Sequence, residues 1–242
     1  MLIAFITLLI AGIVKGAIGS GVPVIVIPIL TMLYDVQLAI AVLIAPNLFS
    51  NALQVWQYRQ HLLPLRFLAA FSLAGGLGII LGTWGLVVLS PDILSLGVAC
   101  AIVMYLAIKL AKRHLALPLH TATRIVIPVG LLAGGLQGAA GMSAPASVTF
   151  LNAMQLERRV YIGSISVFFV AITSVQVPAL LSTGILTWER ALFSVAALLV
   201  ILATMPLGAN LGKRLPHHWF DNLIMLLLAA IASKIFFDTL IG

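Results

Sequence analysis

Apolar residues run through this chain in blocks that are long enough to cross a lipid bilayer. Of its 242 residues, 62% are hydrophobic and 8% are charged, which is too few charged residues to cover the surface of a soluble domain. A membrane-spanning helix needs about 20 mostly apolar residues. Blocks near that size cover residues 1–33, 36–58, 65–89, 93–110, 125–154, 160–181, 191–211 and 220–240. The pattern predicts an all-α, polytopic helical membrane protein of about eight hydrophobic segments, which form a single domain over residues 1–242.

The basic residues and the single cysteine exclude several classes of protein. The formal net charge is +7, but the cations stand mostly in short loops between the blocks, where they act as topology signals beside anionic lipid. We therefore expect membrane lipid, and not nucleic acid, as a partner. Cys100 lies inside an apolar block, so a disulfide framework and a zinc cluster are both excluded, and we expect no metal and no cofactor.

The chain contains an internal repeat. Residues 11–23 align without a gap with residues 133–145, which is an offset of 122 from Ala11 to Ala133. Repeat one covers about residues 1–115 and repeat two about residues 122–242, each with one long block followed by three ordinary segments. Two related halves that enclose a central site are typical of secondary transporters. An old duplication without mechanistic content is the alternative.

The first block of each half is too long for one span. As a straight helix, residues 1–33 would measure about 50 Å, against about 30 Å of hydrocarbon core. Glycine weakens a helix and proline suits the first turn of a new one, so we predict a break before Pro23 and another before Pro145. The glycines that we assign to the backbone of these breaks are Gly16, Gly19, Gly21, Gly138 and Gly141.

The distribution of lysine and arginine favours a hairpin at each break. If every block crosses the membrane once, eight cations lie on one side and four on the other; if both broken blocks fold back, the division is ten to two. The positive-inside rule selects the second arrangement. It predicts an inverted repeat in the inner membrane of a bacterial cell, with both termini on the non-cytoplasmic side. Two full crossings within each broken block would give the same parity and stay an alternative.

Lys15 is the only basic residue deep within an apolar block. The six acidic residues all stand at segment ends or in loops, so the sequence offers Lys15 no carboxylate partner. Ionisable side chains at membrane depth usually serve a function, and an anionic substrate is a natural partner for this one. The alternative is that Lys15 extends to a nearby interface and keeps its charge in water.

Polar stripes mark the second segment of each half. Spacings of three, four and seven residues place the members of each stripe on one helix face, which must point into the protein. The first stripe consists of Asn47, Ser50, Asn51 and Gln54, and the matching one of Ser166, Thr173 and Gln176. The offset of 122 pairs Asn51 with Thr173 and Gln54 with Gln176. Hydrogen bonding between helices is the structural alternative to a substrate site.

The breaks add donors that suit an anion. Free N–H groups at a helix start, together with the helix dipole, favour negative charge. Ser20 and Ser143 stand in the two breaks and can donate hydrogen bonds. We therefore predict a central site for a small anion between the halves. Its predicted binding residues are Lys15, Ser20, Asn51, Gln54, Gln137, Ser143, Thr173 and Gln176.

The glycine pattern resembles that of the TauE/SafE family of sulfite exporters, also called the 4-toluene sulfonate uptake permease family. The resemblance lies in Gly12-x3-Gly16-x2-Gly19-x-Gly21 with Pro28, in the second copy Gly134-x3-Gly138-x2-Gly141, and in the duplicated length. The second copy departs from the first where Gln137 replaces Lys15, Ser143 replaces Gly21 and Phe150 replaces Pro28. The resemblance implies a secondary transporter that exports sulfite or a sulfonated organic anion.

Two other classes of function compete with anion export. Gly19-Ser20-Gly21 is faintly similar to a serine nucleophile in a tight turn, but the five histidines stand near loops and no acid lies at depth to complete an intramembrane enzyme. We therefore assign no catalytic residue. A subunit of a membrane complex that transports nothing itself is the second competitor, although it would not need two polar, glycine-broken repeats.

Overall fold

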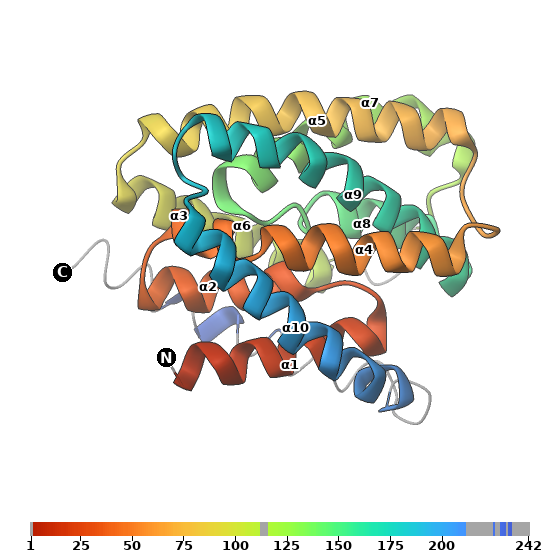
Figure 1. The fold of residues 1–242 in the computed structure, drawn as a ribbon. Coiled ribbons are helices and arrows are strands. Elements are labelled where there is room, and N and C mark those ends of the chain that lie inside the picture. The colour runs from red at the N-terminus through yellow and green to blue at the C-terminus, as the bar shows by residue number, and fades with distance from the viewer. Residues whose placement is uncertain (1, 112–115, 212–224, 226–227, 231, 234–242) are drawn as a thin grey trace.

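The protein is helical throughout the part of the chain that the structure describes. The computed structural model describes residues 2–111, 116–211, 225, 228–230 and 232–233, so most of the predicted segment 220–240 lies outside the described residues. Ten helices occupy the described part, with no strand between them (Figure 1). They are α1 Leu2–Ile18, α2 Val22–Leu33, α3 Val36–Val42, α4 Ile44–Tyr58, α5 Leu65–Val88, α6 Pro91–Ala111, α7 Leu119–Ala140, α8 Ser147–Ala153, α9 Arg158–Ser182 and α10 Trp188–Leu211.

Five stretches are long and apolar enough to span a membrane. They are Val36–Tyr58, Leu65–Val88, Leu119–Ala140, Arg158–Ser182 and Trp188–Leu211. Three shorter apolar helices, Leu2–Ile18, Val22–Leu33 and Pro91–Ala107, accompany them. Large apolar side chains face outward along these helices, including Trp84 at 70% and Leu199 at 63% exposure, as expected for surfaces that meet lipid tails. The chain is therefore a multi-pass membrane protein.

The second segment consists of two helices instead of the single one expected from the sequence. α3 ends at Val42, Leu43 forms a turn, and α4 begins at Ile44. Pro46 lies in the first turn of α4, where the missing N–H is no loss because first-turn amides have no partner within the helix. The start of α3 is capped by Asp35, whose carboxylate accepts a hydrogen bond from the amide of Leu38 at 2.7 Å.

The first block is broken where glycines permit it. α1 ends at Ile18 and α2 begins at Val22, with Pro23 in its first turn. Gly19 and Gly21 have φ angles of 82° and 104°, which residues with a Cβ rarely adopt. In Figure 1, α1 and α2 run in opposite directions on either side of this turn.

The second block is broken in the matching place. α7 ends at Ala140, and Gly141 closes it with a φ angle of 67°. Pro145 precedes α8, which begins at Ser147. α7 and α9 both begin at the same end of the bundle in Figure 1, so the chain between the end of α7 and the start of α9 returns to that end.

The assignment of Gly16 and Gly138 to the breaks was wrong. Gly16 lies inside α1 and Gly138 inside α7, in regular helical backbone. Their role is close packing, since a Cβ on Gly16 would collide with the carbonyl oxygen of Met205 and one on Gly138 would lie 2.7 Å from that of Ile79. Small residues allow helix backbones to approach in this way within membranes.

The helices of the two halves interlock reciprocally. α1 of the first half packs on α10 of the second, and α7 of the second half packs on α5 of the first. Gly12 lies against Thr204 of α10, and Gly134 lies against Gly75 of α5. Gly208 on α10 meets the backbone of α1 in the same manner. Each glycine-rich helix therefore crosses the third segment of the opposite half.

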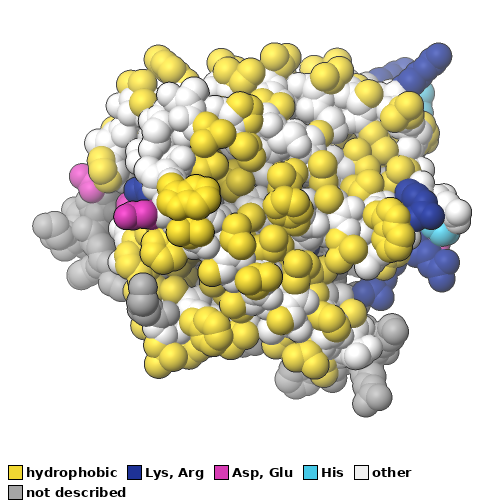
Figure 2. Space-filling model, viewed as in Figure 1, with side chains coloured by type: hydrophobic (Ala, Val, Ile, Leu, Met, Phe, Trp, Pro, Cys, Tyr) yellow, Lys and Arg dark blue, Asp and Glu magenta, His cyan; other side chains and the backbone are white. Residues whose placement is uncertain are grey.

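Charged side chains gather at the two ends of the bundle. Most of the visible basic side chains lie at one end, on the right in Figure 2, whereas acidic side chains and one basic side chain are visible at the opposite end. The basic end holds the starts of α5, α7 and α9 (Figure 1), and its described cations are Arg59, Arg66, Arg124, Arg158 and Arg159. The opposite, acidic end holds the starts of α3, α6 and α10 (Figure 1), where Asp35, Asp92, Glu189 and Arg190 stand. Between the ends, the surface is apolar (Figure 2).

Candidate functional site

A buried ion–amide pair joins the first two segments. The Nζ atom of Lys15 on α1 donates a hydrogen bond to Oδ1 of Asn51 on α4 at 2.9 Å. Both side chains are buried, with exposures of 2% and 1%. The amide of Asn51 donates in turn to the carbonyl oxygen of Asn47 at 2.6 Å, which fixes the orientation of its oxygen toward the ammonium. Lys15 therefore does not extend to the surface, and its amino group is held by the side-chain oxygen of Asn51.

The matched positions of the second half form a cluster of neutral amides. Gln137, which stands where the first half has Lys15, donates to Oε1 of Gln176 at 3.5 Å. Gln176 donates to the carbonyl oxygen of Gln137 at 3.3 Å. The side chain oxygen of Gln137 accepts from the amide of Ser143 at 3.1 Å, so this cluster is anchored to the second break. The Ser147 hydroxyl extends it by donating to the carbonyl oxygen of Ser143 at 2.9 Å.

The two polar stripes meet across the halves. Ser166 on α9 donates to Oε1 of Gln54 on α4 at 3.0 Å, and both residues are buried. Thr173, the partner of Asn51 in the repeat, is 1% exposed and its hydroxyl has no hydrogen-bond partner in the described structure. Thr31, Ser72 and Thr83 share this property, so it is not confined to the stripe. A buried hydroxyl without a partner costs about 1–3 kcal/mol, which a bound polar ligand or water would offset.

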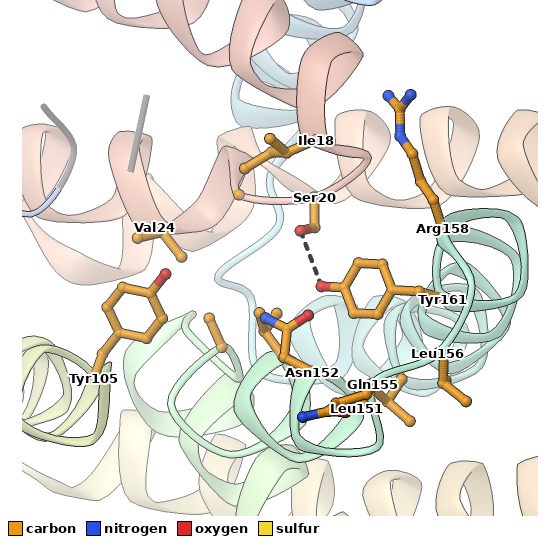
Figure 3. Close-up of a pocket in the computed structure, with 13 residues that line it drawn as sticks. Ile18, Ser20, Val24, Tyr105, Leu151, Asn152, Gln155, Leu156, Arg158 and Tyr161 are labelled. Carbon is orange, nitrogen blue, oxygen red and sulfur yellow. Dashed lines mark hydrogen bonds between the residues drawn. The ribbon is translucent and has the colours of Figure 1, made fainter. Parts of the chain in front are cut away.

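A cavity of about 310 Å³ opens beside the first break (Figure 3). Ser20 and Gly21 of the break line it together with Ala144 of the second break. The hydroxyls of Ser20 and Tyr161 lie 3.3 Å apart within it. Its other lining residues are Ile18, Val24, Tyr105, Val148, Leu151, Asn152, Gln155, Leu156 and Arg158. The cavity therefore touches both breaks and lies next to the basic end, where α9 begins.

The structure divides the eight predicted binding residues among four places. Lys15 and Asn51 form the first group, and Gln137, Ser143 and Gln176 form the second. Ser20 lies apart from both, in the cavity. The two remaining predicted residues, Gln54 and Thr173, belong to the facing stripes of α4 and α9.

Sequence reasoning missed the part of the cavity that α8 and α9 contribute. Arg158 and Tyr161 come from the first turn of α9, and Asn152 comes from the end of α8. These residues have no polar counterparts in the first half, so the repeat gave no signal for them. The sequence signal that could have identified them is their position after the second break, because a hairpin there brings the loop between α8 and α9 beside the first break.

The described residues offer no grouping for a metal. No three histidine, cysteine, aspartate or glutamate side chains come together among them. Cys100 is exposed on α6 and is not among the residues that line the cavity. The polar groups that converge inside are amides, hydroxyls and one ammonium, a set suited to holding a small polar solute by hydrogen bonds.

A buried lysine, buried amides and broken helices inside an apolar bundle are typical of membrane transporters. The family described as sulfite exporter TauE/SafE matches residues 4–235, nearly the whole chain. The chain belongs to this family, which consists of transporters and not of enzymes. No curated protein and no solved structure matches the chain.

Proposed function

We propose that this protein exports a small anion, sulfite or an organosulfonate, through a central site between its two repeats. The observation that carries the proposal is the buried Lys15–Asn51 pair. A buried ammonium without a carboxylate partner is costly, and an anion that binds beside it relieves that cost. Membership of the sulfite exporter family supports the class of substrate.

We assign the central site to the buried polar residues of both halves. Lys15 supplies the charge, while Asn51 and Gln54 from α4 and Gln137 and Gln176 from α7 and α9 supply amide donors. Amide N–H groups bind oxyanion oxygens without adding charge, so the site attracts an anion but can release it. The hydroxyls of Ser20, Ser143 and Thr173 complete the predicted set.

The proposed architecture is a single domain of two inverted repeats, about residues 1–115 and 122–242, with eight segments of which two are hairpins. The reciprocal packing of α1 on α10 and of α7 on α5 supports it. So does Figure 1, in which α5 and α10, the third segments of the two halves, run in opposite directions across the bundle. An inverted pair can alternate access to a fixed site by moving one half against the other.

The proposed location is the inner membrane of a bacterial cell, with the basic end of the bundle in the cytoplasm and both termini on the other side. Five described arginines lie at the basic end, whereas Arg190 alone lies at the acidic end. The positive-inside rule then assigns the basic end to the cytoplasm.

Flux of sulfite from proteoliposomes tests the proposal. Purified protein is reconstituted with ³⁵S-sulfite inside, and efflux is compared with that from protein-free liposomes. Sulfate, a carboxylate and an aromatic sulfonate then compete from the same side to define the substrate class. Efflux no faster than that from protein-free liposomes, for sulfite and for every competitor tested as a labelled substrate, would remove anion transport as the function.

A further inference from the structure

The cavity at the basic end has a counterpart position in the other half of the chain. The offset of 122 pairs Gly19 with Gly141, and it pairs Ile40 with Ile162. A Cβ on Gly19 would meet Ile162 of α9, and a Cβ on Gly141 would meet Ile40 of α3. The two breaks therefore pack in equivalent surroundings, so the residues around them can be compared position by position.

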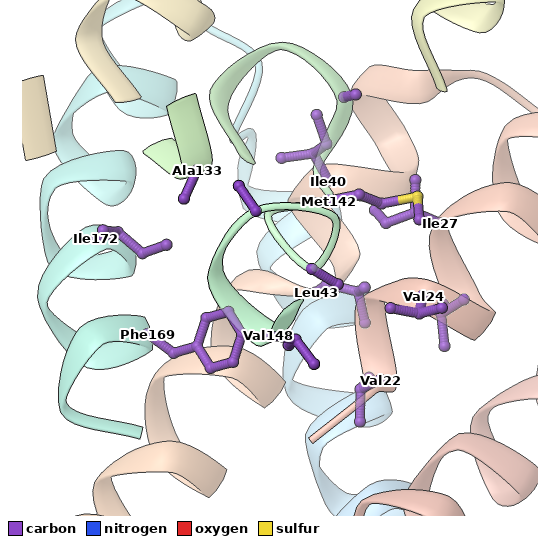
Figure 4. Packing of buried hydrophobic residues seen from close by; sticks show 14 of the residues in the cluster. Val22, Val24, Ile27, Ile40, Leu43, Ala133, Met142, Val148, Phe169 and Ile172 are labelled. Atoms are coloured by element: carbon purple, nitrogen blue, oxygen red, sulfur yellow. The ribbon is translucent and has the colours of Figure 1, made fainter. Parts of the chain in front are cut away.

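At the acidic end, the matched positions are apolar and closed. The residues that correspond to Ser20, Asn152, Arg158 and Tyr161 are Met142, Leu30, Val36 and Ala39, respectively. None of these four apolar side chains is more than 4% exposed. Figure 4 shows Met142 beside Ile27 and Ile40, so the second break is covered by packed hydrocarbon.

At the basic end, the same four positions are polar, and Asn152 and Arg158 among them reach solvent. Asn152, Gln155 and Arg158 are exposed and line the cavity. The Ser20 hydroxyl, which is buried, meets the Tyr161 hydroxyl at the inner part of this lining (Figure 3). None of the thirteen lining residues is acidic, and Arg158 is the cation among them.

The charge of Arg158 is held in place by the end of α1. Its Nη2 donates to the carbonyl oxygen of Ala17 at 2.7 Å, in the last turn of that helix and three residues before Ser20. A guanidinium has five N–H donors, and this bond uses one of them. A fixed cation at the mouth of a cavity raises the local concentration of anions within a Debye length, which is about 8 Å at physiological ionic strength.

We propose that the cavity at the basic end is a capture site for small anions, distinct from the buried amides, with Arg158 as its cation. Its size of about 310 Å³ accommodates an oxyanion with water or a small organic anion. The proposal rests on the proposed function only for the direction of transport, in which the anion moves from this cavity to the buried site. The matched positions around the second break are filled by packed apolar side chains and form no such site.

The alternative role for Arg158 is a helix cap. An arginine that binds the last carbonyl oxygens of α1 stabilises that helix end, whatever passes through the protein. A cap affects stability, but it does not make the cavity select reagents by charge. A measurement of charge selectivity inside the cavity therefore separates the two roles.

The test places a cysteine in the cavity and probes it with thiol reagents of opposite charge. Asn152→Cys is made in a Cys100→Ser background, and its labelling rates with sulfonatoethyl methanethiosulfonate and trimethylammonioethyl methanethiosulfonate are compared in detergent. The rates are normalised to those of a small free thiol. We expect the anionic reagent to be favoured about three- to tenfold. Arg158→Gln should abolish this preference, whereas Arg159→Gln, an exposed neighbour outside the lining, should keep it.

Each outcome decides the proposal. A preference that survives Arg158→Gln, or that Arg159→Gln reduces equally, would overturn it, because the selectivity would then belong to the whole basic end. If Asn152→Cys does not fold, Gln155→Cys replaces it. Leu30→Cys, at the matched outer position, should resist both reagents.

Labelling does not depend on transport, so its result stands even if the proposed function fails. Where sulfite flux is seen, Arg158→Gln should raise the sulfite concentration for half-maximal flux about three- to tenfold. An unchanged value would show that Arg158 attracts anions without delivering them to the pathway, and the capture role would be wrong.

Discussion

Nζ of Lys15 and Oδ1 of Asn51 lie 2.9 Å apart, 36 residues apart in the chain and away from solvent. The repeat places Gln137 and Thr173 at the matched positions. The first half therefore contributes a charge where the second contributes a neutral amide. Two fixed charges would hold an anion too tightly to release it, whereas one charge with neutral donors allows binding and release.

Replacing Lys15 by glutamine makes the first half like the second. Glutamine keeps a donor for Asn51 but removes the charge, and a hydrogen bond to a charged group contributes about 1.5–3 kcal/mol. Since about 1.4 kcal/mol corresponds to a factor of ten, sulfite flux should fall at least about tenfold. Sulfite flux in proteoliposomes measures the effect. The control is Arg124→Gln, which removes one charge at an exposed position of the basic end. Equal flux in the two variants would remove Lys15 from the site.

The amide cluster of the second half gives a separate prediction. Gln176→Ala removes the donor to the carbonyl oxygen of Gln137 and the acceptor for its side chain. Flux should fall about tenfold while the protein still elutes as a single folded species, since the loss is of about 1–2 kcal/mol of hydrogen bonding. Ser174→Ala on the same helix is the control, because its exposed hydroxyl bonds only to Val170 of its own helix. A Gln176→Ala protein that transports normally would make the cluster purely structural.

Neighbouring glycines of α7 differ in what surrounds them. A Cβ on Gly134 would collide with the backbone carbonyl of Gly75, whereas a Cβ on Gly135 would lie 3.9 Å from the carbonyl oxygen of Gly78. Gly134→Ala should therefore destabilise the protein by about 1–3 kcal/mol, and Gly135→Ala should leave it unchanged or slightly more stable. Thermal unfolding in detergent, followed by the loss of monodisperse protein, measures both. A fall of similar size in the two variants would contradict the close packing of α5 and α7.

The sequence predicted the helical, membrane-spanning character of the fold and the place of its first break. Long apolar blocks predicted the helices, and the run from Gly19 to Pro23 predicted the first break, because glycine permits positive φ and proline begins a helix. Gly16 and Gly138 were misassigned because the sequence does not distinguish a glycine that ends a helix from one that lets a neighbouring helix pack closely. The two roles differ in whether another helix lies against the glycine, here α10 or α5, and that contact is visible only in the tertiary structure.

The candidate site was predictable where the two halves of the chain match, and at Lys15, which is a basic residue deep in an apolar block. Pairing of the halves singled out Asn51, Gln54 and Gln176, which are buried polar residues. Arg158 and Tyr161 of the cavity align with apolar residues in the first half, so comparison of the halves did not identify them. The anion-capture role that we propose for them depends on a difference between the halves, whereas the repeat alignment identifies only positions that are similar.

The orientation of the bundle predicts which loops are reached from each side of the membrane. In a Cys100→Ser background, His61→Cys reports on the loop between α4 and α5, and Thr183→Cys on the loop between α9 and α10. An impermeant thiol reagent added to intact spheroplasts should label the second variant and spare the first. Inverted vesicles should reverse the pattern. Labelling of His61→Cys in spheroplasts would place the basic end outside the cytoplasm and contradict the positive-inside assignment.

Export need not be coupled to another ion. The described acidic residues all stand at helix ends: Asp35 and Glu157 precede α3 and α9, and Asp92 and Glu189 lie in the first turns of α6 and α10. None of them is placed to relay a proton at membrane depth. A potential that is negative inside drives an anion outward by about 2.3 kcal/mol per charge per 100 mV, which corresponds to a concentration ratio of about 50.

Uniport and proton coupling can be separated by applying each driving force alone. Proteoliposomes loaded with ³⁵S-sulfite receive a potassium gradient and valinomycin at equal pH, so that only voltage acts. A uniported anion should leave faster when the interior is negative, by up to the ratio of about 50 at 100 mV for one charge. Reversal of the potassium gradient is the internal control and should slow efflux. If voltage of either sign leaves efflux unchanged while a pH gradient alone drives it, sulfite crosses with a proton and uniport is wrong.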